Sequence, residues 1–293
     1  MAGTPDTAPA ATALRALMAR EMQFRTGTVP DNVDGRPVAV GDQLLAGDAY
    51  LLRTTSGFGY FYRKGHGLIV EQPPGADPNE QALWLNAGVY SAVACINGLK
   101  PIHASAVAWD GRVYAFTGAP GAGKSTLVAA LGDCGLPMFC DDTLVLDLSG
   151  GPVICLPGHK RLKLTPQALA LTGAQPQEKV SSAVDKFFAV PASGEVGVPL
   201  PLAQLVFLER GEIPAVEPLS GGERLARLGE SHYTEFLFEQ ANALDRAEVF
   251  QQRAQLARRV AMSRLVRPWT PDRVAQSADF VARWIRAAGK QRR

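Results

Sequence analysis

The spacing of hydrophobic positions changes twice along the chain and divides it into three parts. Apolar residues recur at helical spacing over residues 13–22, and the residues before them, rich in Ala, Pro and Thr, favour disorder. Residues 36–71 instead contain short, often alternating segments bounded by glycine or charge, which is typical of strands. The pattern predicts an α/β protein with a flexible tail and short helix (1–22), a small β-rich unit (23–76) and a larger domain with a helical C-terminal part (77–293).

The clearest helix start in the chain lies at residues 77–80, Asp-Pro-Asn-Glu. Asp77 can cap the helix, Pro78 fits its first turn, and Glu80 can close a capping box. We expect this helix to end near residue 97. Its apolar stretch, residues 82–99, carries Asn and Ser side chains, which favours a buried helix over a membrane span.

A glycine-rich loop follows two expected strands, residues 102–107 and 112–117, which an Asp-Gly turn joins as a hairpin. Residues 118–125 are Gly-Ala-Pro-Gly-Ala-Gly-Lys-Ser and fit the pattern G-x-x-x-x-G-K-[ST]. A helix is expected from Lys124. A strand, a glycine loop and a helix in this order are what a phosphate-binding loop requires, although a glycine-rich turn that binds nothing would share the pattern.

The chemistry of this loop points to a nucleotide. Glycines let backbone N–H groups turn toward a phosphate, and a helix N-terminus adds unpaired donors. We expect Lys124 to reach the β- and γ-phosphates of ATP and the Ser125 hydroxyl to hold Mg²⁺. The expected nucleotide-binding residues are Gly118, Ala119, Pro120, Gly121, Ala122, Gly123, Lys124, Ser125 and Thr126.

An acidic pair, Asp141-Asp142, follows an apolar strand expected over residues 136–140. A carboxylate at the end of such a strand can reach Mg²⁺ beside the phosphates, although an aspartate pair can also cap a turn. Residues 157–163 form a basic loop just downstream, and an expected polar loop over residues 175–184 precedes Lys186. Charge makes Lys160, Arg161 and Lys186 candidates for binding an anionic or acidic substrate, but a solvated turn explains the basic loop equally well.

The remaining pattern and the composition exclude several classes of protein. Residues 219–223, Leu-Ser-Gly-Gly-Glu, match the signature of ABC transporter ATPases, but the apolar strand ending in acid lies before them, so we expect a loop and a helix start. A net charge of +2 without a basic stripe argues against nucleic acid. Four cysteines in apolar runs, with no C-x-x-C pair, and the lack of a signal peptide favour a cytoplasmic protein with no membrane partner.

The run His103-Ala-Ser-Ala-Val, the glycine loop and Asp141-Asp142 resemble the C-terminal domain of HPr kinase/phosphorylase over roughly residues 102–210. The resemblance implies a P-loop fold related to phosphoenolpyruvate carboxykinase and ATP-dependent phosphorylation of a serine hydroxyl. It implies that one aspartate accepts the serine proton while the other helps to hold metal, with His103 supporting the base. We name Ser125 and Asp142 as the metal pair, and both aspartates stay candidates for the base.

Two departures from that family bear on the substrate. No counterpart of its R-G-L-G segment, which is tied to HPr handling and to the reverse phosphorylase reaction, is present, and the N-terminal unit differs from the usual one. The layout is similar to the HPr-kinase-like proteins of lasso peptide gene clusters, which phosphorylate a C-terminal serine of a precursor peptide. The main hypothesis is therefore a peptide or protein serine kinase, with a lasso precursor favoured. The alternatives are an HPr-type kinase of carbon regulation, a small-molecule kinase and a non-catalytic ATP-binding module; a homo-oligomer is left open.

Overall fold

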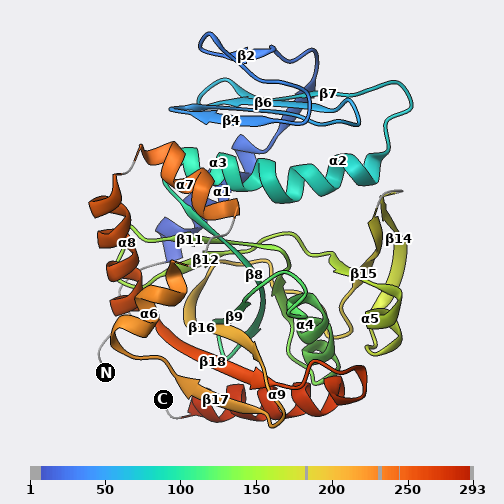
Figure 1. The fold of residues 1–293 in the computed structure, drawn as a ribbon, viewed down its shortest axis with the longest axis vertical. Coiled ribbons are helices and arrows are strands. Elements are labelled where there is room, and N and C mark those ends of the chain that lie inside the picture. The colour runs from blue at the N-terminus through green and yellow to red at the C-terminus, as the bar shows by residue number, and fades with distance from the viewer. Residues whose placement is uncertain (1–7, 182–183, 230–232, 244, 291–293) are drawn as a thin grey trace. The chain divides into compact units, whose positions relative to one another are not determined.

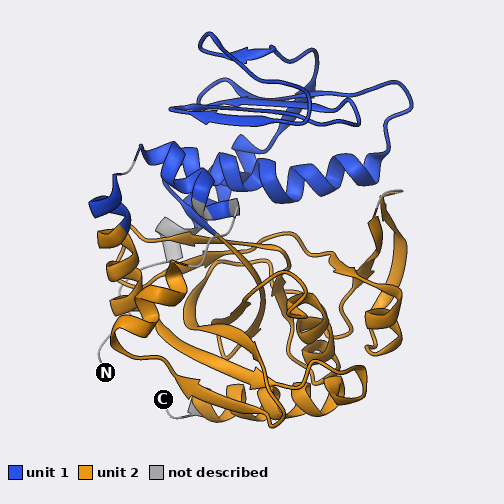
Figure 2. Cartoon of the chain, viewed as in Figure 1, with its two compact units in different colours: residues 1–101, 231–249 blue, residues 102–230, 250–293 orange. Residues whose placement is uncertain are grey.

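The computed structural model describes residues 8–181, 184–229, 233–243 and 245–290 (Figure 1). The chain divides into two compact units (Figure 2). Residues 1–101 and 231–249 form unit 1, and residues 102–230 and 250–293 form unit 2. The expected boundary near Asp77 differs from this division by about one helix, because that helix packs against the later segment 233–242 within unit 1.

Unit 1 contains a five-stranded sheet with the strand order β1-β7-β6-β5-β4. All neighbouring strands are antiparallel except β1 and β7, and the strands predicted over residues 49–54, 57–63 and 67–71 are confirmed within two residues. The strand predicted at residues 36–40 is only two residues long in the structure, because Pro37 has no N–H to donate. The strands are β1 (Phe24–Thr26), β2 (Asn32–Val33), β3 (Arg36–Pro37), β4 (Gln43–Ala46), β5 (Ala49–Arg53), β6 (Gly59–Arg63) and β7 (Gly67–Glu71).

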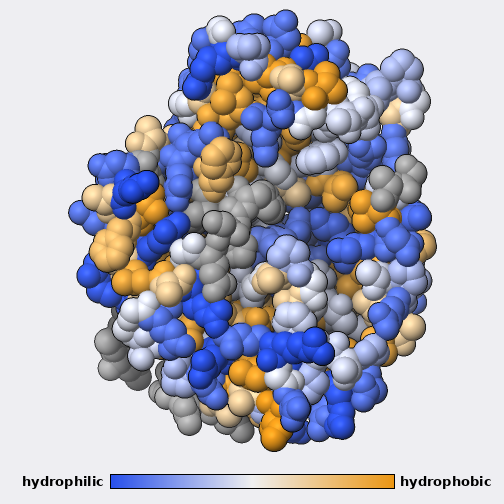
Figure 3. All heavy atoms as spheres, viewed as in Figure 1, coloured by the Kyte–Doolittle hydropathy of each residue, from blue (hydrophilic) through white to orange (hydrophobic). Residues whose placement is uncertain are grey.

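The helices of unit 1 begin with α1 (Ala8–Glu21), which starts five residues earlier than predicted because its alanines favour helix. The predicted helix from Asp77 is confirmed: the Asp77 carboxylate accepts from the Asn79 N–H at 2.9 Å and caps the first turn. This helix comprises α2 (Pro78–Trp84), one π-helical turn (Leu85–Val89) and α3 (Tyr90–Ile96). Helix α7 (Tyr233–Asn242) packs against α3. On the face of unit 1 drawn in the space-filling view, hydrophobic and hydrophilic residues are interspersed (Figure 3).

Unit 2 is built on an eight-stranded mixed sheet with the order β10-β8-β11-β12-β16-β18-β17, in which β9 pairs with both β8 and β16. Strands β9, β16 and β18 run parallel, so their carboxyl ends lie at one edge of the sheet. The strands are β8 (Lys100–Trp109), β9 (Arg112–Thr117), β10 (Met138–Cys140), β11 (Thr143–Asp147), β12 (Ile154–Leu156), β16 (Leu200–Arg210), β17 (Ala215–Pro218) and β18 (Ala261–Arg267).

Helices cover both faces of this sheet, which confirms the mixed α/β class. Strand β9 explains the arrangement, because its side chains alternate between two cores. Tyr114 and Phe116 belong to the core under α4 (Lys124–Asp133) and α9 (Val274–Lys290), whereas Val113 and Ala115 belong to the core under α6 (Gly221–Leu228) and α8 (Arg246–Arg259). Helix α6 also confirms the helix start predicted at residues 219–223.

A three-stranded sheet of order β13-β15-β14 corrects one prediction. Residues 175–184 were expected to be a polar loop, but β14 (Gln175–Ser181) pairs with β15 (Val184–Val190), which pairs in turn with β13 (Leu162–Leu164). An edge strand exposed on both faces needs no apolar alternation, so the sequence pattern carried no signal for β14. The short helix α5 (Pro166–Ala170) follows β13, and the Thr165 hydroxyl accepts from the Ala168 N–H and caps it. Among the described residues, no helix is both long and apolar enough to cross a membrane.

Candidate functional site

The glycine loop joins the end of β9 to the start of α4, as predicted. Gly118 and Gly123 have backbone φ angles of 150° and 76°, which residues with a side chain rarely adopt. A Cβ atom on Gly118 would lie 3.3 Å from the Leu208 carbonyl oxygen, and one on Gly123 would lie 2.8 Å from the Arg267 guanidinium. The backbone conformation therefore favours glycine at both positions, and a side chain at Gly123 would also need the Arg267 guanidinium to move.

The loop has the features of an anion cradle. Gly123 is the N-cap of α4 and supplies no side-chain hydrogen bond to the first turn, so the helix N-terminus can receive an anion. The buried Lys124 ammonium donates to the carbonyl oxygens of Gly118 at 2.9 Å and Ala119 at 3.3 Å, which holds it over the loop. Burial lowers the pKa of Lys124, and the nearby Asp141 and Asp142 carboxylates oppose that effect.

Arg267, which the sequence analysis missed, supports the loop from β18. Its guanidinium donates to the carbonyl oxygens of Ala122 at 2.9 Å and Gly123 at 3.3 Å, and the residue is 4% exposed. Burial lowers its pKa to about 10, which leaves it a cation at neutral pH. The only sequence signal is an arginine that closes an apolar strand before a proline.

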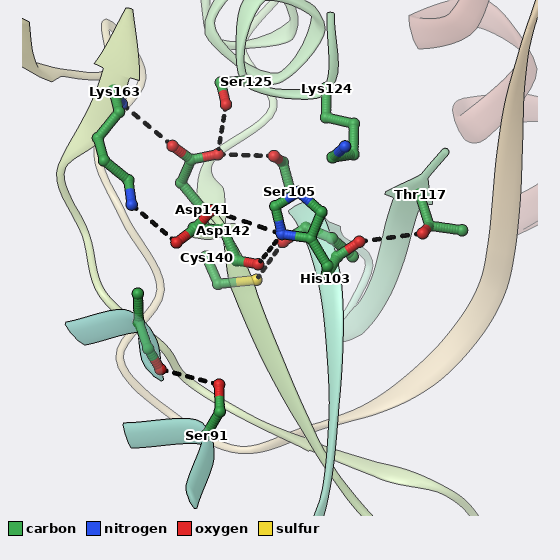
Figure 4. Close-up of polar contacts among 12 residues, drawn as sticks. Ser91, His103, Ser105, Thr117, Lys124, Ser125, Cys140, Asp141, Asp142 and Lys163 are labelled. Carbon is green, nitrogen blue, oxygen red and sulfur yellow. Dashed lines mark hydrogen bonds and ion pairs between the residues drawn. The ribbon is translucent and has the colours of Figure 1, made fainter. Parts of the chain in front are cut away.

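Asp141 is buried, with a hydrogen bond at each carboxylate oxygen (Figure 4). Its Oδ1 accepts from the hydroxyls of Ser105 at 2.6 Å and Ser125 at 2.8 Å. Its Oδ2 accepts from the backbone N–H of Lys163 at 3.1 Å. The acidic pair thus meets the glycine loop through Asp141, whereas Asp142 was the expected metal partner of Ser125.

Asp142 is the more accessible member of the pair, with a side chain that is 22% exposed. Its Oδ2 lies 2.7 Å from the Lys163 ammonium, and its Oδ1 lies 3.4 Å from Nδ1 of His103. Asp142 also has a φ of 71°, a left-handed conformation that is uncommon outside glycine but that aspartate adopts more readily than most residues. Burial raises the pKa of Asp142, but the Lys163 ammonium, with smaller effects of His103 and Lys186, lowers it below its usual value.

His103 lies on β8 between the acidic pair and the glycine loop. Its Nδ1 is 2.9 Å from the Asp142 carbonyl oxygen. Burial and the Lys124 ammonium lower the pKa of His103, so the imidazole is neutral at neutral pH. Because a carbonyl oxygen only accepts, the proton of the neutral ring belongs on Nδ1, and Nε2 is then an acceptor.

The three predicted substrate-binding candidates have different surroundings in the structure. The Lys160 ammonium donates to the carbonyl oxygens of Phe139 and Val196, and Arg161 lies over the Phe188 ring at 3.9 Å while its guanidinium pairs with Glu178. Lys186 is exposed on β15, where its charge lowers the pKa of Asp142. Lys163, the other lysine of the basic loop, is the one that contacts the acidic pair. The alternation Leu162-Lys163-Leu164, in which both leucines are buried, is the signal that could have singled it out.

No protein-family model and no curated protein matches the sequence. Among solved structures, the fold is similar to that of the HPr(Ser) kinase/phosphatase from Coxiella burnetii, with 12% sequence identity and a TM-score of 0.35. The similarity covers 64% of this chain and 95% of that chain.

Proposed function

We propose that this chain is an ATP-dependent serine kinase with a P-loop core of the HPr kinase type. The observation that carries the proposal is the contact between Ser125 of the glycine loop and Asp141 of the acidic pair, at 2.8 Å. A loop suited to phosphates, a hydroxyl–carboxylate pair suited to a hard cation and a second, accessible carboxylate then meet at one place. Phosphoryl transfer needs these three parts, since its catalysis consists of positioning, charge stabilisation and removal of one proton.

Ser125 and Asp141 are the residues that would hold Mg²⁺ in this proposal. Both offer oxygen atoms, which are the ligands Mg²⁺ prefers, and they already lie within hydrogen-bond distance of each other. Bound Mg²⁺ would neutralise charge on the phosphates of ATP. The Ser105 hydroxyl, which donates to the same Oδ1 atom, and the Lys163 backbone N–H, which donates to Oδ2, orient the Asp141 carboxylate. This assignment exchanges Asp141 for the Asp142 expected from the sequence.

Asp142 is then the proton acceptor for the substrate serine. The Asp142 carboxylate is partly exposed, whereas Asp141 is only 1% exposed and both of its carboxylate oxygens accept hydrogen bonds. Lys163 keeps Asp142 ionised, and an ionised carboxylate can take the hydroxyl proton as the new P–O bond forms. His103 contacts the carbonyl and a carboxylate oxygen of Asp142 and so acts as a positioning residue.

Three lysines provide the positive charge that the transferring phosphoryl group needs. Lys124 lies over the loop, Lys163 pairs with Asp142, and Lys186 acts on the pKa of both Asp142 and Lys124. Charges fixed beforehand at a site where negative charge develops stabilise the transition state without reorganisation. Lys160 has a structural role instead, because its ammonium donates to the backbone carbonyl oxygens of Phe139 and Val196.

For the phosphoacceptor we propose a serine at or near the C-terminus of a peptide, with a lasso precursor as the favoured example. The support is the chain layout and the missing R-G-L-G segment. A peptide terminus can enter a cleft that a folded protein surface cannot. The test is incubation with ATP and Mg²⁺ and either HPr or a lasso-type precursor that ends in serine, read by mass spectrometry.

A gain of one phosphate on the terminal serine of the precursor supports this substrate. Phosphorylation of HPr alone would retain the kinase and replace its substrate. ATP binding without phosphate transfer to either protein would favour a regulatory nucleotide-binding module.

The two aspartates are distinguished by Asn variants. Asp142→Asn should still bind ATP but lose kcat by roughly 10²- to 10⁴-fold, the contribution of one acid–base group. Asp141→Asn should instead raise the Mg²⁺ concentration needed for half-maximal activity. Asp185→Asn, an exposed carboxylate on β15, is the matched control. Near-normal kcat in Asp142→Asn would remove it as the base, and an unchanged Mg²⁺ dependence in Asp141→Asn would remove it as a metal ligand.

A further inference from the structure

A small cavity lies directly beside the glycine loop. Gly121, Gly123 and Thr126 form one wall, and the residues of the acidic pair do not border it. Its volume is about 170 Å³. Pockets that enclose a whole small-molecule ligand usually measure roughly 300–1,000 Å³, so this cavity suits one group of a larger ligand.

The position of the cavity along the loop indicates which group. In a phosphate-binding loop, backbone N–H groups hold the α- and β-phosphates and the lysine reaches the β- and γ-phosphates. Here Lys124 and Ser125 are on the side of the acidic pair, where the γ-phosphate must lie for transfer. The opposite end of a nucleotide therefore continues past Thr126 toward the cavity.

We infer that this cavity holds the purine base of the nucleotide, stacked on Trp269. The inference rests on the proposed binding of ATP and adds to it a subsite for the base. Trp269 borders the cavity and is 37% exposed, which leaves part of its indole accessible. It lies in the segment Pro268-Trp-Thr-Pro271, where the two prolines fix their own backbone φ angles on either side of it. Aromatic rings stack on any base, because every base has a π-face.

Two further groups on the cavity wall fit a nucleotide. Leu171 and Ala168, at the end of α5, provide apolar surface for a base. Arg267 also borders the cavity, and its buried Nε has no hydrogen-bond partner among the described residues. The Arg267 guanidinium is a cation at neutral pH, so it can offset the negative charge of a phosphate near the cavity.

A larger cavity of about 580 Å³ also borders Trp269, on a wall that includes Arg210 and Arg273. No residue of the glycine loop lines it, so it does not continue the phosphate site. The base is therefore assigned to the smaller cavity. Stacking on Trp269 predicts that a purine nucleotide binds more tightly than bare triphosphate. Because stacking tolerates any base and Gln167 is an exposed amide, we expect little distinction between ATP and GTP.

The test compares Mg²⁺-ATP with Mg²⁺-tripolyphosphate, measured by calorimetry on the full chain. Trp269→Ala should weaken ATP binding by roughly 5- to 150-fold, the range for loss of one stacked base, and leave tripolyphosphate binding unchanged. Trp269→Phe should retain most of the ATP affinity. ATP, but not tripolyphosphate, should change the tryptophan fluorescence of the unmodified protein, and this change should be absent in Trp269→Phe.

The matched control is Phe250→Ala, which removes an aromatic ring that is 58% exposed on α8. Equal affinity of the unmodified protein for ATP and tripolyphosphate would overturn the base subsite while leaving the phosphate loop intact. Equal losses for both ligands in Trp269→Ala would overturn it too, because they indicate damage to the loop. Binding of neither ligand by the unmodified protein would instead refute the proposed function itself.

Discussion

The ion pair between Lys163 and Asp142 makes a quantitative prediction about pH dependence. An opposite charge within about 4–6 Å lowers a carboxyl pKa by about 1–3 units. The Lys163 ammonium is 2.7 Å from the Asp142 carboxylate, and the two side chains are 12% and 22% exposed, so solvent screens the pair little. Burial alone acts in the opposite direction and raises the pKa of Asp142. Removal of the ammonium should therefore raise the pKa of Asp142.

The size of the shift follows from what remains around Asp142. In Lys163→Ala, Lys186 still lowers its pKa, so the rise should be smaller than the full effect of one neighbouring opposite charge, which is about 1–3 units. The base must be ionised, and its ionised fraction rises with pH through the pKa. A raised pKa therefore moves the ascending limb of the kcat/KM profile to higher pH by the same amount.

The assay is kcat/KM for phosphate transfer across the acidic and neutral pH range at saturating Mg²⁺. Lys163→Arg keeps the charge and should keep the limb near its original position. Lys179→Ala removes an exposed lysine on β14 and serves as the control. The hydrogen bond from the Lys163 backbone to Asp141 persists in all three variants. A limb that stays in place in Lys163→Ala, or moves to lower pH, would refute the role of Asp142 as the base.

Two further variants test the glycine loop. Lys124→Ala removes the ammonium that is expected to contact the β- and γ-phosphates. This variant should lose turnover and bind Mg²⁺-ATP more weakly. Unchanged affinity and turnover would refute the loop as the ATP site. Arg267→Lys keeps a charge but loses the forked contacts to Ala122 and Gly123, so chemical denaturation should show a free energy of unfolding lower by about 1.5–3 kcal/mol, with weaker ATP binding. Unaltered stability would show that these contacts do not hold the loop.

Local patterns in the sequence determined the parts of the site that lie within one element or at its ends. The glycine loop, the strand before it and the helix after it are where the motif predicts them, because φ angles and burial periodicity are local properties. The helix cap at Asp77 and the strand that ends before Asp141 follow for the same reason.

Elements without a local signal were missed or misplaced. Strand β14 is polar throughout its exposed part and is a strand because it pairs with β15. The boundary of unit 1 depends on α7, which packs against α3 from more than a hundred residues away along the chain. Neither pairing leaves a periodic pattern in the segment concerned.

The tertiary structure alone decided which side chains meet. Composition could not distinguish Lys160, Arg161 and Lys163, since all three lie in one basic loop. Lys163 reaches Asp142 because the buried leucines on either side of it fix its face of β13, whereas Lys160 is engaged by two backbone carbonyls. Arg267 supports a loop 145 positions earlier in the chain, because β18 lies beside β16, which in turn pairs with β9. Long charged side chains bind whichever acceptor the packing of the strands brings within reach, and this packing is a property of the whole chain.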